Sequence, residues 1–176
     1  TINVITAKPT DEFEGYLTLT GGNYDLLKVD AALSGPLSDS IRGRLAVTST
    51  NRAGFGENIT TRNDIDDEKR WAARGHLEFD LADDMSLLLS GEYGKQDDAS
   101  GLFTYLTPLY VIEPPVAPPS QAPKGVGGFS DPGSRDGAGN IDPQMQRETT
   151  SLTAAYTWNL SDTLTLKDIL NYRRLD

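Results

Sequence analysis

Long runs in which apolar and polar residues alternate constrain the fold of this chain more than any other feature. In residues 69–80 the odd positions carry Trp71, Leu77 and Phe79, whereas the even positions carry mainly charged side chains. A period of two places apolar side chains on one face of a β-strand and polar ones on the other. The runs last ten to thirteen residues, whereas strands of globular proteins centre on about 5–6. The sequence therefore predicts an all-β fold with long strands.

Seven such runs follow one another, and short turns join several of them. Each of three turns has a Leu, a small residue and an Asp, at residues 37–39, 81–83 and 160–162. Asp and Ser bond their own backbone and favour chain reversal, so each turn predicts a β-hairpin. A further hairpin turn is expected at Gly21-Gly22-Asn23, where the glycines can supply the positive φ of a tight turn. The expected strands are residues 12–20, 24–34, 40–52, 69–80, 85–93, 148–158 and 163–175.

Much longer, polar connections alternate with the short turns. They span residues 54–68 and 98–147, and the second is rich in Gly, Pro and Asp. Short periplasmic turns and long external loops are typical of outer-membrane β-barrels, in which about ten residues of a tilted strand cross the hydrocarbon layer. We therefore expect an antiparallel transmembrane β-barrel segment of about seven strands, located in a bacterial outer membrane and in contact with its lipid.

The aromatic residues support a membrane location for one face of the strands. Amphipathic rings concentrate at the two membrane–water interfaces, at opposite ends of an apolar band. Aromatic residues at the edge of a soluble core are the alternative explanation. The expected membrane-interface aromatics are Phe13, Tyr24, Trp71, Phe79, Tyr93, Trp158 and Tyr172.

The other face carries charged residues, which a water-filled or plugged barrel interior can accommodate. In most soluble folds, helices or a second sheet would bury the charged side chains of this face, which are Arg42, Arg44, Arg70, Arg74, Glu78 and Glu92. On the lipid face an Arg near mid-bilayer costs about 2–4 kcal/mol, and no strand has one there. This face therefore predicts a barrel lumen.

Composition excludes several classes of function. The 176 residues include no Cys and one His, and the formal net charge is −10. An acidic chain is not expected to bind nucleic acid, whose phosphates attract a basic surface. Because His76 is the only imidazole, triads and paired-His metal sites have little support, so we expect no enzyme activity, no cofactor and no metal site.

Several pieces of the chain, taken in order, resemble one family, the TonB-dependent outer-membrane receptors. Residues 1–10 look like the last strand of that family's plug domain and its exit into the barrel. The pieces that look like barrel strands are Glu14-Gly15-Tyr16, Gly22-Asn23-Tyr24-Asp25, residues 34–39, Arg44-Leu45-Ala46, residues 69–75 and Asn171-Tyr172-Arg173-Arg174.

This resemblance implies a 22-stranded barrel filled by an N-terminal plug, which imports a scarce solute with energy relayed by TonB. Siderophores, vitamins and carbohydrates are the solute classes it implies. The chain would then divide into residues 1–10, the end of the plug, and residues 11–176, a partial barrel wall with external loops 54–68 and 98–147. TonB would bind an N-terminal region that this sequence lacks, so we expect a fragment of a receptor.

Two other architectures remain open at this point. The first is a complete eight-stranded barrel that uses Ile2 to Thr6 as its extra strand. The second is a soluble β-sandwich that acts as a binding module. If a small molecule or metal chelate binds within this chain, aromatic and cationic side chains of the long external loop are the expected contacts, because loops carry recognition. They are Phe103, Tyr105, Tyr110, Phe129 and Arg135.

Overall fold

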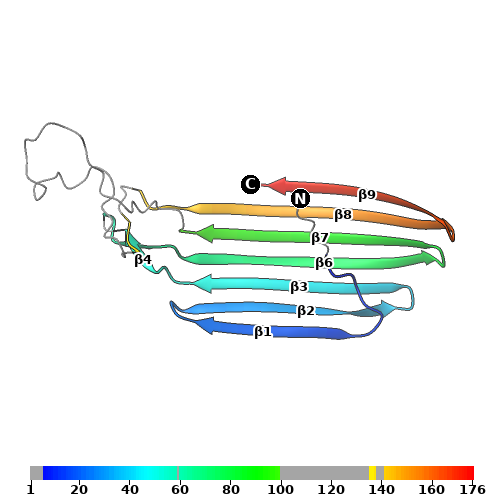
Figure 1. Ribbon diagram of the computed structural model, residues 1–176, viewed down its shortest axis with the longest axis horizontal. Helices are drawn as coiled ribbons and strands as arrows, with labels where there is room; N and C mark the ends of the chain where they lie inside the picture. The colour runs from blue at the N-terminus through cyan, green and yellow to red at the C-terminus, as the bar shows by residue number, and fades with distance from the viewer. Residues whose placement is uncertain (1–5, 59, 100–134, 138–140) are drawn as a thin grey trace, which may run out of the picture.

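The computed structural model describes residues 6–58, 60–99, 135–137 and 141–176, and these form one large antiparallel sheet (Figure 1). Its strand order is β1-β2-β3-β6-β7-β8-β9, and β4 and β5 form a separate two-stranded hairpin. The predicted all-β antiparallel fold is confirmed. The strands are β1 (Glu14–Gly22), β2 (Leu26–Ser38), β3 (Ile41–Arg52), β4 (Gly56–Asn58), β5 (Asn63–Ile65), β6 (Glu68–Ala82), β7 (Met85–Asp98), β8 (Met145–Ser161) and β9 (Leu164–Leu175).

The register aligns apolar residues with one another across the whole sheet. One cross-strand row reads Leu33, Leu45, Gly75, Gly91, Leu152 and Tyr172 from β2 to β9. The adjacent row, one residue closer to the end of the sheet that carries the three short turns, reads Ser34, Arg44, His76, Ser90, Thr153 and Asn171. Because neighbouring rows point to opposite sides of a sheet, the first row lies on an apolar outer face and the second on a polar inner face.

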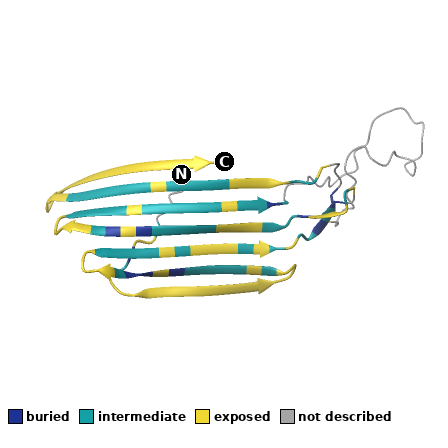
Figure 2. Ribbon diagram, turned by 180° about the vertical axis from the view of Figure 1, so that it is seen from behind, coloured by how far each residue is buried: buried dark blue, intermediate teal, exposed yellow. Residues whose placement is uncertain are grey.

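The apolar outer face has no protein layer against it. Leu33 is 62% exposed and Leu170 is 68% exposed, and Ala32 and Ile65 are the only buried hydrophobic side chains among the described residues. Figure 2 shows exposure along the whole of both edge strands, β1 and β9. An apolar face of this extent needs non-aqueous surroundings. A sandwich would instead cover such a face with a second sheet, whereas the other sheet among the described strands, the β4–β5 hairpin, lies at the end of the long strands (Figure 1).

Each of the three Leu-small-Asp turns combines a β-bulge with a reversal of two residues. The register shifts at Leu37, Leu81 and Leu160, and the chain then reverses at residues 39–40, 83–84 and 162–163. The reversing residues have negative φ. Turns of that kind do not match the twist of paired strands, and a bulge adds local twist that restores the pairing.

The turns are also bonded to one another along this end of the sheet. The amide of Asp80 donates to the Ser40 carbonyl at 2.9 Å, and the amide of Asn159 donates to the Asp84 carbonyl at 2.8 Å. In each case the residue before a bulge bonds the preceding turn. The turns therefore form a continuous rim.

The expected turn at Gly21-Gly22-Asn23 is wrong in its position. Gly21 and Gly22 pair with Leu27 and Leu26 as part of β1. The positive φ angles fall at Tyr24 (60°) and Asp25 (54°). The pairing register explains the position of this turn, because shifting a strand by one residue would move all its outer side chains to the inner face. Asp tolerates this conformation better than most residues.

The chain before β1 crosses the inner face of the sheet near the rim (Figure 1). The Lys8 ammonium lies 3.4 Å from the Glu78 carboxylate, and the Asp11 carboxylate lies 2.6 Å from the Arg42 guanidinium. The Thr10 amide and hydroxyl both contact the Ser34 hydroxyl, at 3.0 and 2.8 Å.

These contacts cover polar groups of the inner wall. Glu78 and Ser34 are both buried, although they belong to strands with no protein layer on the other face. Of the extra strand expected in an eight-stranded barrel, residues 2–5 lie outside the described residues, and Thr6 is not in a strand. The described inner face therefore binds a segment of its own chain through ion pairs and hydroxyl groups.

The structure gives both expected external loops different bounds or content. The first, 54–68, contains the β4–β5 hairpin, and the second overlaps β8, which begins at Met145. No helix in the described part of the chain is long and apolar enough to cross a membrane.

The two faces predict opposite responses to the same substitution in β3. Leu45→Arg places a guanidinium in the middle of the outer face and should destabilise the membrane-inserted protein by about 2–4 kcal/mol. Thr48→Arg on the inner face lies beside Asp30, which accepts a hydrogen bond from Thr48 at 2.7 Å, and should cost little. Denaturant titration of the receptor folded into lipid vesicles measures both. Equal losses for the two variants would contradict the assignment of the faces.

Candidate functional site

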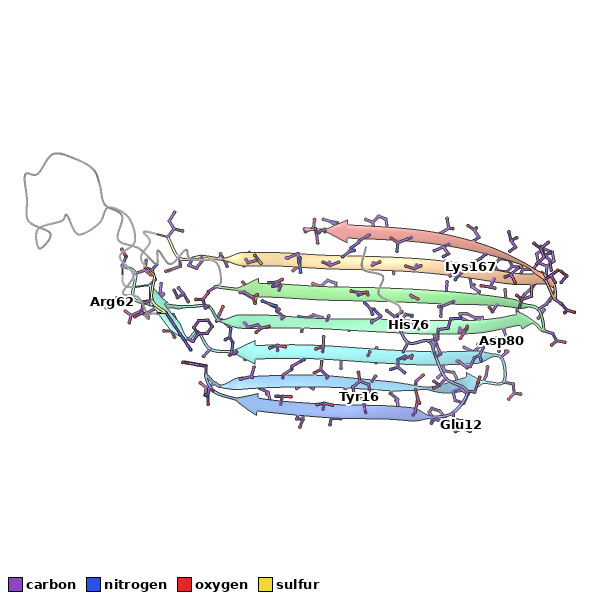
Figure 3. All side chains as sticks on the ribbon, viewed as in Figure 1. Glu12, Tyr16, Arg62, His76, Asp80 and Lys167 are labelled. Carbon is purple, nitrogen blue, oxygen red and sulfur yellow. The ribbon has the colours of Figure 1, made fainter. Side chains whose placement is uncertain are left out.

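The long connections gather at the end of the sheet opposite the rim, where they pack against each other. Figure 3 shows Arg62 at this end and Asp80 at the other. The β4–β5 hairpin contains two of the most deeply buried side chains among the described residues, Ile65 at 1% and Asn58 at 0% exposure. Because a folded loop with its own small core holds its side chains in place, this end can present a defined surface to a solute.

Arg135, one of the expected ligand contacts, binds two aromatic residues of other segments. Its guanidinium lies 5.3 Å from the centre of the Phe55 ring and donates to the Tyr24 hydroxyl at 3.2 Å. The Arg52 guanidinium lies over the same ring at 4.8 Å. The ring centres of Tyr24 and Phe55 are 6.0 Å apart. These four residues, which we call the aromatic clamp, tie the second long loop to the first loop and to the β1–β2 turn.

The backbone reinforces the aromatic clamp. The Gly137 amide donates to the Glu57 carbonyl at 3.0 Å, and the Glu57 amide donates to the Asp136 carboxylate at 2.9 Å. A side chain at Gly56 would collide with the Arg135 carbonyl. Glycine is therefore required where the two loops come closest.

Asp142 is the second point at which the loops join. Its carboxylate accepts hydrogen bonds from Asn58 Nδ2 at 2.8 Å, from Asn63 Nδ2 at 2.6 Å and from the Thr61 hydroxyl. Hydrogen bonds from Thr61 and then Asn63 lower the pKa of Asp142 below its ordinary value, because they stabilise the ionised form. All three donors belong to the β4–β5 hairpin or its turn.

Two polar hollows lie on this half of the molecule. The first, of about 710 Å³, opens between the loops and the strand ends, and its lining includes Arg52, Asp64 and Asp142. The second, of about 400 Å³, lies where the inner face approaches the loops, and its lining combines several basic residues with the carboxylates of Glu68 and Glu92. Arg147 and Arg173 line the second hollow and make no ion pair with any described residue.

The structure brings together only part of the expected ligand site. Arg135 lies in the aromatic clamp, whereas Phe103, Tyr105, Tyr110 and Phe129 lie outside the described residues. No group of three His, Asp or Glu side chains in the described ranges could hold a metal ion. His76 lies midway along β6 on the inner face, 2.7 Å from the Ser90 hydroxyl (Figure 3).

Five of the expected interface aromatics lie toward the ends of the outer face, whereas Tyr24 belongs to the aromatic clamp. Trp71 and Tyr93 contact each other near the loop end, with ring centres 5.2 Å apart. Trp158 donates to the Asp84 carboxylate at 2.9 Å beside the rim. Phe13 lies over Gly35, near the rim end of β2. Phe79 lies in the last outer row before the rim, and Tyr172 lies near mid-strand.

Sequence reasoning missed Phe55 and Asp142 as joints between the loops. The sequence Gly54-Phe55-Gly56 contained a signal, since one aromatic residue between two glycines in a polar loop suggests a ring held by close backbone contacts. Asp142 offered no comparable signal, because its partners lie about eighty positions earlier in the chain.

The long strands, the uncovered apolar outer face, the polar inner face and the loops gathered at one end define a segment of a transmembrane β-barrel wall. Known proteins support this class. The chain is 30% identical over 112 residues to the ferripyoverdine receptor of Pseudomonas aeruginosa, a match that covers 62% of this chain and 13% of that protein. No family model matches the chain.

Solved structures show the same fold. The ferripyoverdine receptor of the outer membrane of Pseudomonas aeruginosa, bound to ferripyoverdine, superposes with a TM-score of 0.69 and 23% identity, over 95% of this chain and 20% of that one. The FpvAI–pyocin S2 complex gives a TM-score of 0.66 and 22% identity, over 95% and 19%.

The chain is thus similar to a segment of the barrel of an outer-membrane receptor, in agreement with its resemblance to the TonB-dependent receptors. It spans about a fifth or less of the length of these relatives. The relatives are receptors rather than enzymes.

The hydrogen bonds of Asp142 predict a pH-dependent joint between the loops. A lowered pKa means that the ionised carboxylate stabilises loop closure above its ordinary pKa of 3.8. This stabilisation is lost as the pH falls through the lowered value in the folded protein. Amide hydrogen exchange of residues 56–58 and 60–65, corrected for the intrinsic pH dependence of exchange, should therefore show strong protection at neutral pH and weaker protection in strong acid.

Asp142→Asn should speed the same amide exchange at neutral pH, because an amide replaces one acceptor oxygen with a donor. Asp64→Asn is the matched control, since this exposed carboxylate in β5 makes none of these hydrogen bonds. Unchanged exchange in Asp142→Asn would contradict the proposed joint.

Proposed function

We propose that this chain forms part of the wall and external loops of a receptor that imports a polar iron chelate across the outer membrane. The observation that carries the proposal is the 30% sequence identity to a ferripyoverdine receptor. In this proposal the solute is a siderophore complex rather than a vitamin or a carbohydrate. The chain contributes binding and passage, with no catalytic step.

The division of the chain fits such a receptor. We assign residues 1–10 to the end of a plug domain and residues 11–176 to the wall, with external loops near 54–68 and 98–147. The ion pairs of Lys8 and Asp11 with Glu78 and Arg42 support this assignment, because they hold the first described residues against the inner wall. TonB would act through parts of the receptor outside these residues.

The inner face near the loops has the chemistry to bind an anionic chelate. Arg147 and Arg173 line the 400 Å³ hollow and make no ion pair among the described residues. Guanidinium groups bind carboxylates and similar oxygen anions through paired hydrogen bonds. The contacts of residues 6–12 fall on the rim half of the sheet and leave this hollow uncovered. A solute that passed the loops would reach these arginines next.

Uptake of radioactive iron tests the proposal. A strain that lacks the gene should lose uptake of at least one ferric siderophore from a defined panel, and the wild-type gene should restore it. If the deletion strain takes up every ferric chelate at the wild-type rate, the proposal fails.

A charge-removing pair on one strand tests the role of the inner face. Arg173→Gln should raise the half-saturating chelate concentration about tenfold or more, because a charge-assisted hydrogen bond is worth about 1.5–3 kcal/mol. Lys167→Gln removes the same charge from the same face of β9, near the rim (Figure 3), and should leave uptake unchanged. Equal effects of the two variants would exclude a specific role for Arg173.

A further inference from the structure

A small apolar patch interrupts the polar inner face of the sheet. It consists of Leu88, Ala155 and Ile169, which lie side by side on β7, β8 and β9. Ile169 is 55% exposed, and the other two are partly exposed. The nearest inner-face residues on either side of this inner apolar patch, along the same three strands, are all polar: Ser86, Ser90, Thr153, Thr157, Lys167 and Asn171.

The inner apolar patch continues a row of the sheet that already holds the chain before β1. From β3 to β9 this inner row reads Arg42, Glu78, Leu88, Ala155 and Ile169. Asp11 lies 2.6 Å from the first residue of the row, and Lys8 lies 3.4 Å from the second. Traced backwards from Asp11 to Lys8, the chain therefore advances from β3 to β6 (Figure 1). The next strands in that direction are β7, β8 and β9, which carry the patch.

The chain that precedes Lys8 is long enough to cover the patch. Neighbouring strands are about 4.8 Å apart, so Ala155, two strands beyond β6, is displaced from that strand by about 10 Å, and Ile169 by about 14 Å. An extended chain spans about 3.3 Å per residue, so Val4 can lie up to about 13 Å from Lys8, and Ile2 up to about 20 Å. Residues 2–5 can therefore reach every part of the patch.

The sequence of residues 2–5, which is Ile-Asn-Val-Ile, directs apolar side chains towards the wall. Side chains of an extended chain point alternately to opposite sides, and Pro9 favours an extended conformation for the residue before it. Because the Lys8 ammonium contacts the wall, the same alternation directs Val4 and Ile2 to the wall as well.

The chemistry of the patch selects an aliphatic occupant. Ala155 is the smallest of the three residues, so the branched side chain of Val4 fits above it, between Leu88 and Ile169. Contact there removes apolar surface from water, which is favourable. A polar solute placed on the same residues would lose hydration without gaining a hydrogen bond.

We infer that Leu88, Ala155 and Ile169 form the seat of residues 2–5 of this chain, with Val4 packed over Ala155. Residues 2–11 then cross the inner face from β3 to β9 along one row. Ion pairs hold one end of this segment and apolar packing holds the other. The seat concerns the assembly of the receptor, so its test does not depend on the proposed uptake function.

Disulfide cross-linking in the full-length receptor, folded into lipid vesicles, tests the seat. Val4→Cys is combined with Ala155→Cys in one variant and with Ala154→Cys in the matched control, whose cysteine lies one residue away on the outer face. After oxidation with copper phenanthroline and proteolysis, mass spectrometry measures the yield of the linked peptide. We expect at least about tenfold more from the first pair, because a disulfide requires Cα atoms within about 7 Å.

Filling the space above Ala155 gives a second readout that needs no cysteine. The Thr10 amide donates to the Ser34 hydroxyl at 3.0 Å, and its exchange reports how firmly the segment is held. Ala155→Leu should speed that exchange about tenfold, equivalent to about 1.4 kcal/mol, because Val4 loses its place. Ala154→Leu adds the same volume to the outer face and should leave the exchange unchanged.

Equal yields from the two cysteine pairs, or no linked peptide from either, would overturn the inference. A link from Val4→Cys to Thr149→Cys, near the loop end of β8, would also overturn it, because the segment would then lie elsewhere on the inner face. If the cysteine variants do not assemble, equal Thr10 exchange in the two Leu variants decides against the seat. A receptor that forms the expected link but imports no ferric chelate would retain the seat and lose the proposed function.

Discussion

The pairing of backbone amides and carbonyls is the constraint on which this structure depends. A strand in hydrocarbon finds no water for its backbone, so every polar group needs a neighbouring strand. Five of the seven long strands have neighbours on both sides, and the edge strands β1 and β9 have one each within the described sheet. A lipid-exposed edge is not viable, so β1 and β9 need further strands beside them. This region covers about a fifth of the length of the related receptors.

Once the backbone is paired, the register determines what each face can do. The outer rows bring leucines and glycines into line, and the inner rows bring together the charged groups that bind residues 6–12 and line the 400 Å³ hollow. The ends of the sheet are built differently. The rim is closed by short bulged turns bonded to one another, whereas the opposite end carries loops joined by the aromatic clamp and by Asp142. The same strands thus carry the apolar outer face on one side and the polar inner face on the other, with the rim at one end and the joined loops at the opposite end.

The sequence was sufficient for the fold class, the strands and the two faces, because a period of two and the burial requirement fix the register together. It failed at the β1–β2 turn, where the general preference of glycine for positive φ suggested Gly21 and Gly22, but pairing placed the reversal at Tyr24 and Asp25. The joints between the loops could not be predicted, since Arg135 and Tyr24 are 111 positions apart. No local pattern encodes a contact of that kind, whereas alternation within a strand is local.

Spin-label accessibility along β3 would test the central claim most directly, and these 176 residues contain no Cys that would compete for the label. Labels would be placed one at a time at residues 44–49 of the receptor in lipid vesicles. The structure predicts that odd positions are accessible to oxygen dissolved in lipid and even positions to a water-soluble nickel chelate. Accessibility with no period of two, or nickel access at the odd positions, would contradict a barrel wall with an outer lipid face and an inner polar face.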